Sequence, residues 1–260
     1  MKALETYFKK RKKAINLILE KAPDCYTVET FHELRLEIKR LKALFELIAF
    51  CSKKFKLQKA YKPFRIIFKK AGKIREIQLE QTLIEKQPNF HLLKKYPNRL
   101  KKLETKEIKN FFTTANKRLI KKLKGKYRKI IRFFTKTSKK KVNRYRNKAR
   151  KEMKRLIQKN DFKKKQIHDF RKQLKVYQYN EKILHPNQKK IVPDQHKMSD
   201  LLGKWHDYDV VILHLKKIIS TFKKDSNERK QLRIIKVTMT SKRAFQFVKI
   251  NAALPYQSFL

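Results

Sequence analysis

The sequence predicts an all-α protein built from long helices, and two observations carry this prediction. Its 260 residues include only three glycines, and the seven prolines lie between long stretches that contain neither residue. Sheets joined by hairpins need many turn glycines, so all-β and doubly wound folds are disfavoured. Apolar residues instead recur at helical spacing, as at Leu34, Ile38, Leu41, Phe45 and Ile48.

Eight helices are expected in order along the chain, joined by short connections that contain proline or asparagine and suit antiparallel neighbours. The apolar stripe just described marks the second helix, and a matching stripe through Phe170, Leu174 and Tyr177 marks the sixth. Pro88–Leu103 is the least regular segment, and we expect a long connection there with room for one short helix. The expected helices cover about 4–21, 29–53, 63–87, 105–134, 138–159, 162–184, 194–222 and 227–250.

The charge balance predicts a polyanionic partner. The chain has 72 Lys and Arg against 22 Asp and Glu, which gives a net charge of +50. Such a chain resists its own compaction, so we expect it to work beside nucleic acid, an anionic membrane face, an acidic protein or a phosphate polymer. Its apolar content of 40% is enough for a core and argues against disorder.

Other features of the composition place the protein in the cytoplasm. Charged residues interrupt every apolar stretch well before the roughly 18 residues of a membrane span. The first residues have no apolar signal region, so we expect a soluble intracellular protein. Cys25 and Cys51 have no CxxC spacing and are expected to be reduced thiols.

The chain contains an internal repeat. Residues 31–35 (Phe-His-Glu-Leu-Arg) correspond to residues 167–171 (Ile-His-Asp-Phe-Arg), and each motif is followed by a lysine at the same spacing. Downstream, residues 72–77 and 203–208 both read Gly-Lys-apolar-basic-acidic-apolar. Two matches in the same order indicate a tandem duplication. We therefore expect a single domain over 1–260, with repeats at about 4–136 and 138–250 that form two four-helix bundles related by an approximate two-fold axis.

The repeated helices place cations on the face opposite the core. At 100° per residue, Arg35, Lys39 and Lys42 share one side of the first repeated helix with His32. The second copy carries an equivalent row, and the third helix carries a basic row with similar spacing. A phosphate chain lying along such rows could accept one charge-assisted hydrogen bond per turn, and two facing rows would form a basic cleft. The alternative is that these rows are solvated outer faces of the bundle.

Metal binding and catalysis are disfavoured. His32 and His168 have arginine and lysine as same-face neighbours, which oppose a divalent cation. Glu76, Asp207 and Asp209 are expected to orient nearby cations rather than to act as catalytic acids. The chain has no GxxxxGK[ST] loop, GxSxG elbow, HExxH motif or Glu-x-Glu pair for metal-assisted phosphate chemistry. We therefore expect a binding protein without a cofactor, not an enzyme.

The two His-x-x-Arg-x-x-x-Lys motifs and the two downstream Gly-Lys motifs together resemble the CHAD family, the conserved histidine α-helical domain. The resemblance covers about residues 4–250 and implies two four-helix bundles around a basic channel. It also implies binding of long-chain inorganic polyphosphate, with bacterial members on polyphosphate granules. The sequence departs from the pattern at Val176 and Gln178, where the first copy has Arg40 and Lys42. It departs again at Glu76, where the family tends to have aspartate.

A nucleic-acid-binding protein remains the second hypothesis, and a scaffold for an acidic protein the third. Aromatic residues interleaved with the basic rows would favour nucleic acid, but within 32–42 and 168–175 they lie on the core side. The residues expected to bind polyphosphate are His32, Arg35, Lys39, Arg40, Lys42, Arg65, Lys69, Lys73, Arg75, Lys126, Arg132, Arg144, His168, Arg171, Lys172, Lys175, Lys204 and His206.

Overall fold

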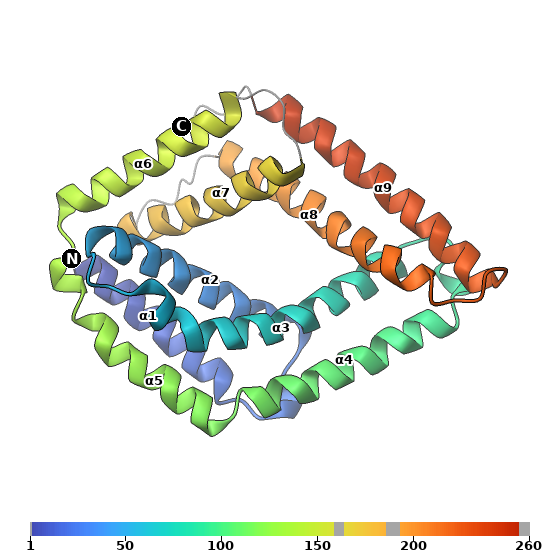
Figure 1. Ribbon diagram of the computed structural model, residues 1–260, viewed down its shortest axis with the longest axis horizontal. Coiled ribbons are helices and arrows are strands. Elements are labelled where there is room, and N and C mark those ends of the chain that lie inside the picture. Colours follow the sequence, from blue (N-terminus) through green and yellow to red (C-terminus); the bar gives the residue numbers. More distant parts are fainter. Residues whose placement is uncertain (1, 159–163, 186–192, 255–260) are drawn as a thin grey trace.

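The computed structural model describes residues 2–158, 164–185 and 193–254, and every regular element in these residues is helical (Figure 1). The all-α prediction is confirmed. Three short 3₁₀ helices lie at Pro23–Cys25, Phe90–Leu92 and Phe134–Lys136. The α-helices of the described residues are α1 (Lys2–Leu19), α2 (Val28–Cys51), α3 (Leu57–Glu85), α4 (Lys95–Thr114), α5 (Lys117–Ile131), α6 (Lys139–Gln158), α7 (Lys164–Leu184), α8 (Pro193–Ile219) and α9 (Asn227–Ala253).

The predicted boundaries are wrong around α4. The single helix expected at 105–134 is divided into α4 and α5, and α4 already begins at Lys95, inside the expected connection. Pro97 lies in the first turn of α4, where a missing N–H costs no helical hydrogen bond. Asn116 causes the division, because its Oδ1 accepts a hydrogen bond from the Leu119 N–H at 3.0 Å and caps α5.

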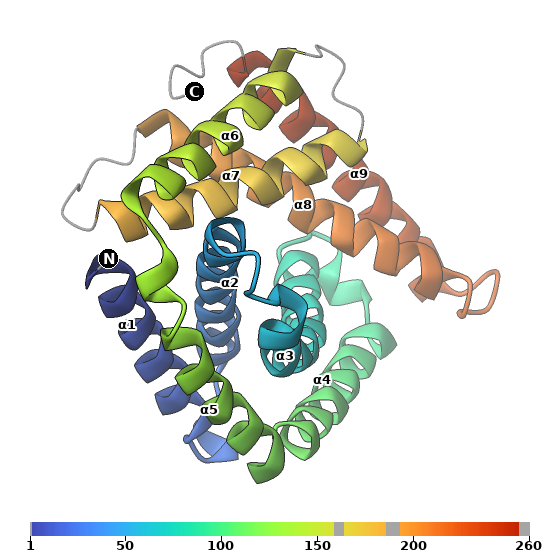
Figure 2. The same ribbon diagram turned by 60° about the vertical axis from the view of Figure 1, so that its left-hand side comes forward.

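The helices that carry the repeated motifs lie in the interior of the arrangement. Figure 1 shows α4, α5, α6 and α9 along the outline, with α2, α3, α7 and α8 inside it. α2 packs against α3, α6 and α7, and α3 also contacts α8. The two halves of the sequence therefore meet through the helices that carry the repeated motifs. Turned by 60°, the molecule shows α6 and α7 crossing above the end of α2 (Figure 2).

The buried apolar residues form three clusters. The first joins α1, α2, α5 and the N-terminal part of α3, and includes Phe8, Leu34 and Phe64. The second joins the C-terminal parts of α3 and α8 to the N-terminal parts of α4 and α9. The third joins α6 and α7 to the N-terminal part of α8 and the C-terminal part of α9, around Phe170 and Trp205. Because the second cluster draws on both halves of the sequence, it holds them together. The two-bundle symmetry remains a prediction.

None of the described helices is both long enough and apolar enough to cross a membrane.

Candidate anion-binding site

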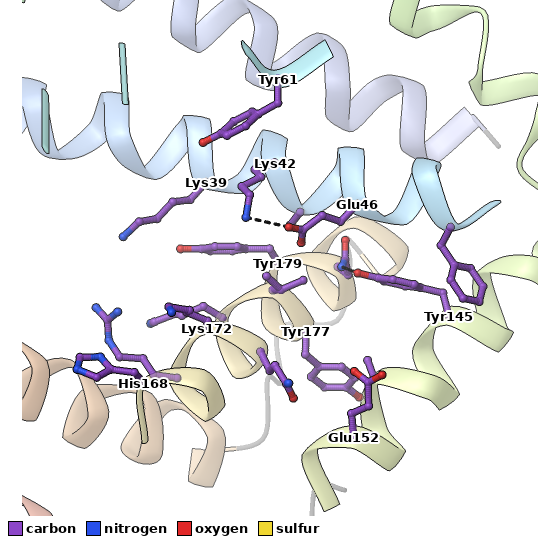
Figure 3. A pocket seen from close by; sticks show the side chains of 18 of the residues that line it. Lys39, Lys42, Glu46, Tyr61, Tyr145, Glu152, His168, Lys172, Tyr177 and Tyr179 are labelled. Carbon is purple, nitrogen blue, oxygen red and sulfur yellow. Dashed lines mark hydrogen bonds and ion pairs between the residues drawn. The ribbon is translucent and has the colours of Figure 1, made fainter. Parts of the chain in front are cut away.

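A cavity of about 790 Å³ lies between α2, α3, α6 and α7, and His206 of α8 also lines it. Ten of the lining side chains are lysine or arginine, whereas two are glutamate. Figure 3 shows Lys39 and Lys42 on the α2 side of the cavity and His168 and Lys172 on the α7 side. The cationic lining residues are Arg35, Lys39, Lys42, Arg65, Lys69, Arg146, Lys148, Arg171, Lys172 and Lys175.

The start of α2 fixes the first of the two motif helices. Thr27 Oγ1 accepts a hydrogen bond from the Thr30 N–H at 3.2 Å, and Thr30 Oγ1 accepts one from the Thr27 N–H at 3.3 Å. This capping box satisfies two backbone donors at the helix end. It sets the start of the helix, and with it the direction in which Arg35 and Lys39 point.

Four cations form the centre of the site: Arg35 and Lys39 from α2, and Arg171 and Lys175 from α7. Burial, followed by the charges of the other three, lowers the pKa of Lys39 to about 8. Burial also lowers the pKa of Arg35, of Arg171 and of Lys175. Within the described residues none of the four has a carboxylate at ion-pair distance. At longer range the charges of Glu76, Asp200 and Asp207 partly offset the burial of these cations, and a bound anion would favour their charged forms further.

Arg35 is held against α3. Its Nη1 donates a hydrogen bond to the Phe68 carbonyl at 3.0 Å, and its guanidinium lies 4.3 Å from the centre of the Phe68 ring. The guanidinium crosses the α3 backbone at Gly72, where a Cβ would overlap Arg35 Nη1. The glycine that opens the downstream motif of the first repeat therefore makes room for the arginine of the upstream motif. A Cβ at Gly203, by contrast, would meet nothing within 4 Å.

Arg171 and His206 provide further polar groups in the second repeat. Arg171 Nε and His206 Nδ1 are both buried and have no hydrogen-bond partner among the described residues. Burial, with the charges of Arg171, His168 and Lys39, lowers the pKa of His206 to about 3. The ring is thus neutral at physiological pH and can donate one hydrogen bond without adding charge.

His168 is anchored by a buried carboxylate. Its Nε2 lies 3.3 Å from Asp209 Oδ2, while Asp209 Oδ1 accepts hydrogen bonds from Lys164 Nζ at 2.7 Å and Arg243 Nη1 at 2.8 Å. Burial alone would raise the pKa of Asp209, but the hydrogen bonds from Lys164 and Arg243 outweigh it and lower the pKa. Trp205 packs edge-on against the His168 ring, with centroids 4.9 Å apart. Asp209 therefore pairs with Lys164 and Arg243, as the sequence predicts for it, and it also holds His168 in place.

The end of the cavity next to α6 has a different character. Tyr145 and Phe50 pack together there with ring centroids 5.3 Å apart. The charges at this end are paired: Arg146 forms two hydrogen bonds of 2.7 Å with Glu181, and Lys42 lies 2.9 Å from Glu46. This end is therefore aromatic and nearly neutralised, whereas the centre of the site is cationic and unpaired.

No group of three or more His, Cys, Asp or Glu side chains that could hold a metal ion occurs in the described part of the chain. This holds even though His168 and His206 are neighbours, with ring centroids 5.2 Å apart.

Comparison with known proteins identifies the family. The model of the CHAD domain matches residues 12–216, most of the chain. The chain belongs to the CHAD family. The fold is similar to that in the crystal structure of the CHAD domain from the plant Ricinus communis, with a TM-score of 0.66 and 13% sequence identity. That match covers 96% of this chain and 88% of the plant chain. None of the curated proteins matches this chain.

The cavity of this CHAD domain brings together ten of the eighteen residues that the sequence singles out. Helices α2, α3, α7 and α8 supply them, so residues far apart in the sequence converge on one space. The residues are Arg35, Lys39, Lys42, Arg65, Lys69, His168, Arg171, Lys172, Lys175 and His206.

The other eight residues do not line the cavity. Arg40 lies on another face of α2, where its Nη1 donates to Glu37 Oε1 at 2.6 Å. Lys73 points toward Glu107, with Nζ 3.9 Å from Oε2. His32 lies in the second turn of α2 on the exposed side, and partial burial of its ring, followed by the charge of Arg75, lowers its pKa. Arg75 is half-buried on α3 and does not line the cavity. The remaining residues lie on or next to the outer helices or on the exposed side of α8, and are Lys126, Arg132, Arg144 and Lys204.

Several residues that line the cavity carry no expectation from the sequence. Tyr179 and Tyr61 are one turn from Lys175 and Arg65, so the helical spacing that identifies the basic rows also indicates these two tyrosines. Tyr145 reaches the cavity only because α6 packs against α2 and α7. Within 32–42 and 168–175 the phenylalanine is on the core side as predicted, since Phe170 is buried. The cavity nevertheless has aromatic walls supplied by other segments.

Proposed function

We propose that this CHAD domain binds inorganic polyphosphate in the cavity between α2, α3, α6 and α7, without catalysing a reaction. The family is associated with polyphosphate binding, and membership of it is established over residues 12–216. The observation that carries the proposal for this chain is the cluster of Arg35, Lys39, Arg171 and Lys175. These four cations come from two distant motifs and have no ion-pair partner within the described residues.

Polyphosphate suits this cluster for two physical reasons. Each phosphate offers acceptor oxygens to the arginine forks and lysine ammonium groups, and the chain spaces its charges regularly. Burial, followed by the charges of Arg35, Arg171 and Lys175, lowers the pKa of Lys39, and a bound anion would favour the protonated amine against these effects. The proposal includes the tandem duplication, with α2 and α7 as equivalent helices, and a cytoplasmic location on polyphosphate granules.

Nucleic acid is the second candidate, and the aromatic walls of the cavity are the observation in its favour. Phe50, Tyr61 and Tyr145 line the same space as the cations, and stacking on such rings is how proteins bind bases of single strands. Salt dependence does not separate the two ligands, because both are polyanions that release counterions. Competition at fixed salt does separate them.

Two charge-matched double variants test the site. Arg35→Gln with Arg171→Gln removes two charges from the cavity, whereas Arg132→Gln with Arg144→Gln removes two exposed charges from outer helices. Binding of fluorescent polyphosphate is measured for both at physiological salt. Since a hydrogen bond to a charged group contributes about 1.5–3 kcal/mol, the first pair is expected to weaken binding more than tenfold. The second pair is expected to weaken it by less than about threefold, because exposed charges contribute little.

Equal losses in the two double variants would mean diffuse electrostatic attraction and would refute a site in the cavity. Polyphosphate held by the parent protein should also resist a mass excess of duplex DNA or RNA. Ready displacement by either would favour the nucleic-acid alternative.

A further inference from the structure

The outward face of α9 is apolar. Ile234, Val237, Phe245 and Val248 are between 52% and 62% exposed, whereas the described parts of α4, α5 and α6, the other helices on the outline in Figure 1, expose only Leu103 among their large apolar side chains. Single exposed apolar residues are common on protein surfaces, but a contiguous group of them marks an interaction site. The face of α9 therefore needs an explanation that scattered exposure does not give.

The exposed apolar residues follow the spacing of a helix-packing seam. The α9 stripe consists of Ile234, Val237, Ser241, Phe245 and Val248, which follow one another at steps of three, four, four and three residues. At 100° per residue all five lie within about 80° of one another, and the stripe is about 21 Å long, or four helical turns. Steps of three and four are those by which one helix packs along another.

The opposite face of α9 holds the stripe in place. Leu232, Ile235 and Met239 are fully buried in the cluster shared with α3, α4 and α8, and Ile250 is fully buried in the cluster shared with α6 and α7. These residues lie on the other side of the helix, so the stripe points away from the molecule. A helix anchored in this way is ordered before a partner arrives, which lowers the entropic cost of docking.

The charges beside the stripe are all positive. Arg233 lies on one side of it, and Lys242 and Lys249 lie on the other; all three are exposed and have no ion-pair partner within the described residues. Lys249 Nζ lies 4.2 Å from the centre of the Phe245 ring, so cations and stripe form one surface. Glu228 is the single carboxylate of α9, and it is buried where it accepts hydrogen bonds from the start of α4.

A second copy of this chain does not suit the stripe. Antiparallel pairing about Ser241 would match the stripe to itself, because its residues are placed symmetrically about this serine. The same pairing would bring two Lys242 side chains together beside the two-fold axis, and α9 of a second copy offers no exposed carboxylate to balance them. Each copy also carries a net charge of +50, which opposes self-association.

We propose that the α9 stripe binds an acidic amphipathic helix of a partner protein. The apolar side chains of the partner helix pack on the stripe, and its carboxylates pair with Arg233 on one side and with Lys242 and Lys249 on the other. Flanking charges of this kind determine which helix pairs with which. No residue of α9 lines the cavity between α2, α3, α6 and α7, so this proposal is independent of polyphosphate binding.

A designed peptide tests the proposal on the full chain. The peptide is an amphipathic helix of about three heptads with leucine at positions a and d and glutamate at e and g. Its binding is measured by fluorescence anisotropy at physiological salt without polyphosphate, beside a scrambled peptide of the same composition. We expect the amphipathic peptide to bind about tenfold more tightly or better, because only it can bury an apolar face on the stripe. Equal binding of the two peptides would show attraction by charge alone and overturns the proposal.

Two double variants locate the docking face. Val237→Ser with Val248→Ser removes apolar side chains from the stripe, whereas Leu17→Ser with Leu92→Ser removes two exposed apolar side chains from other elements. The first pair is expected to weaken binding of the amphipathic peptide about tenfold, because two valines no longer contribute apolar burial. The second pair is expected to leave binding unchanged. Equal losses in the two pairs contradict a site on α9.

Charge reversal and sedimentation test the identity of the partner. Lys242→Glu with Lys249→Glu leaves the chain strongly basic, yet it should reduce the preference for the glutamate peptide over a matched lysine peptide at least severalfold. An unchanged preference would overturn an acidic partner. Sedimentation velocity of the full chain alone should show a monomer. A dimer that Val237→Ser with Val248→Ser abolishes would assign the stripe to a second copy and overturn the proposal.

Discussion

Replacement of Gly72 by alanine should disturb the site indirectly. Gly72 does not line the cavity, but it lies against Arg35, which does. A Cβ at Gly72 would overlap Arg35 Nη1, so the guanidinium has to leave its place over α3. Arg35 would then lose its 3.0 Å hydrogen bond to the Phe68 carbonyl and its position 4.3 Å from the Phe68 ring.

The expected magnitude follows from opposing contributions. Glycine to alanine inside a helix stabilises by about 1 kcal/mol. The lost hydrogen bond from a charged donor costs about 1.5–3 kcal/mol, and the lost cation–π contact adds roughly 0.5–1 kcal/mol. Movement of the flexible arginine into solvent recovers part of that cost. The losses exceed the gain by about 1–3 kcal/mol before this recovery. We therefore expect Gly72→Ala to lower the free energy of unfolding by less than about 3 kcal/mol, and to weaken polyphosphate binding severalfold through displacement of Arg35.

Gly203→Ala is the matched control, because Gly203 occupies the corresponding motif and nothing lies within 4 Å of its added Cβ. It should stabilise the protein by up to about 1 kcal/mol and leave binding unchanged. Urea unfolding and binding of fluorescent polyphosphate are measured for both variants. If the two alanines change stability in the same direction and by the same amount, with binding intact in both, the explanation of Gly72 given above is wrong.

Three further expectations concern pH and ligand. Because the pKa of Lys39 is about 8 in the free protein, polyphosphate affinity should fall as pH rises through 8. Lys39→Arg should remove this decline, and identical plots of affinity against pH for the parent and the variant would contradict the role of Lys39. The hydrogen bond to Glu80 raises the pKa of His214 above 6.5. The stabilisation by protonated His214 is therefore complete below pH 6.5 and is lost as pH rises through the raised pKa. The free energy of unfolding in urea should fall over this pH range in the parent protein and not in His214→Gln. Saturating polyphosphate should raise the melting temperature, and no shift at saturation would count against a site formed by the folded protein.

The helical period accounts for what the sequence predicts about the site. Residues on one face of one helix are fixed relative to one another by 3.6 residues per turn, so Arg35 with Lys39, and Arg171 with Lys175, are correctly grouped before any tertiary contact is known. Arg40, included through the family resemblance, lies on another face of α2 beside Glu37. The position of a residue around the helix therefore predicts whether it reaches the cavity better than its membership of the family motif does.

The parts that sequence reasoning misses depend on tertiary packing or on local capping. Tyr145 and Asn180 form the far end of the cavity only because α6 lies across α2 and α7. The division between α4 and α5 depends on the Asn116 cap, a short signal inside a long run of helix-forming residues. Treated as a helix breaker, Pro97 predicts a connection between helices. In the structure it lies in the first turn of α4, where proline is favourable for a helix.

Protection of lysines from an amine-acylating reagent, mapped by mass spectrometry with and without polyphosphate, tests the central claim most directly. Lys39, Lys172 and Lys175 line the cavity, whereas Lys204 is exposed outside it. The account predicts strong protection of the first three and none of Lys204. Uniform protection of exposed lysines over the whole surface, with Lys39 and Lys175 no different from the others, would contradict it.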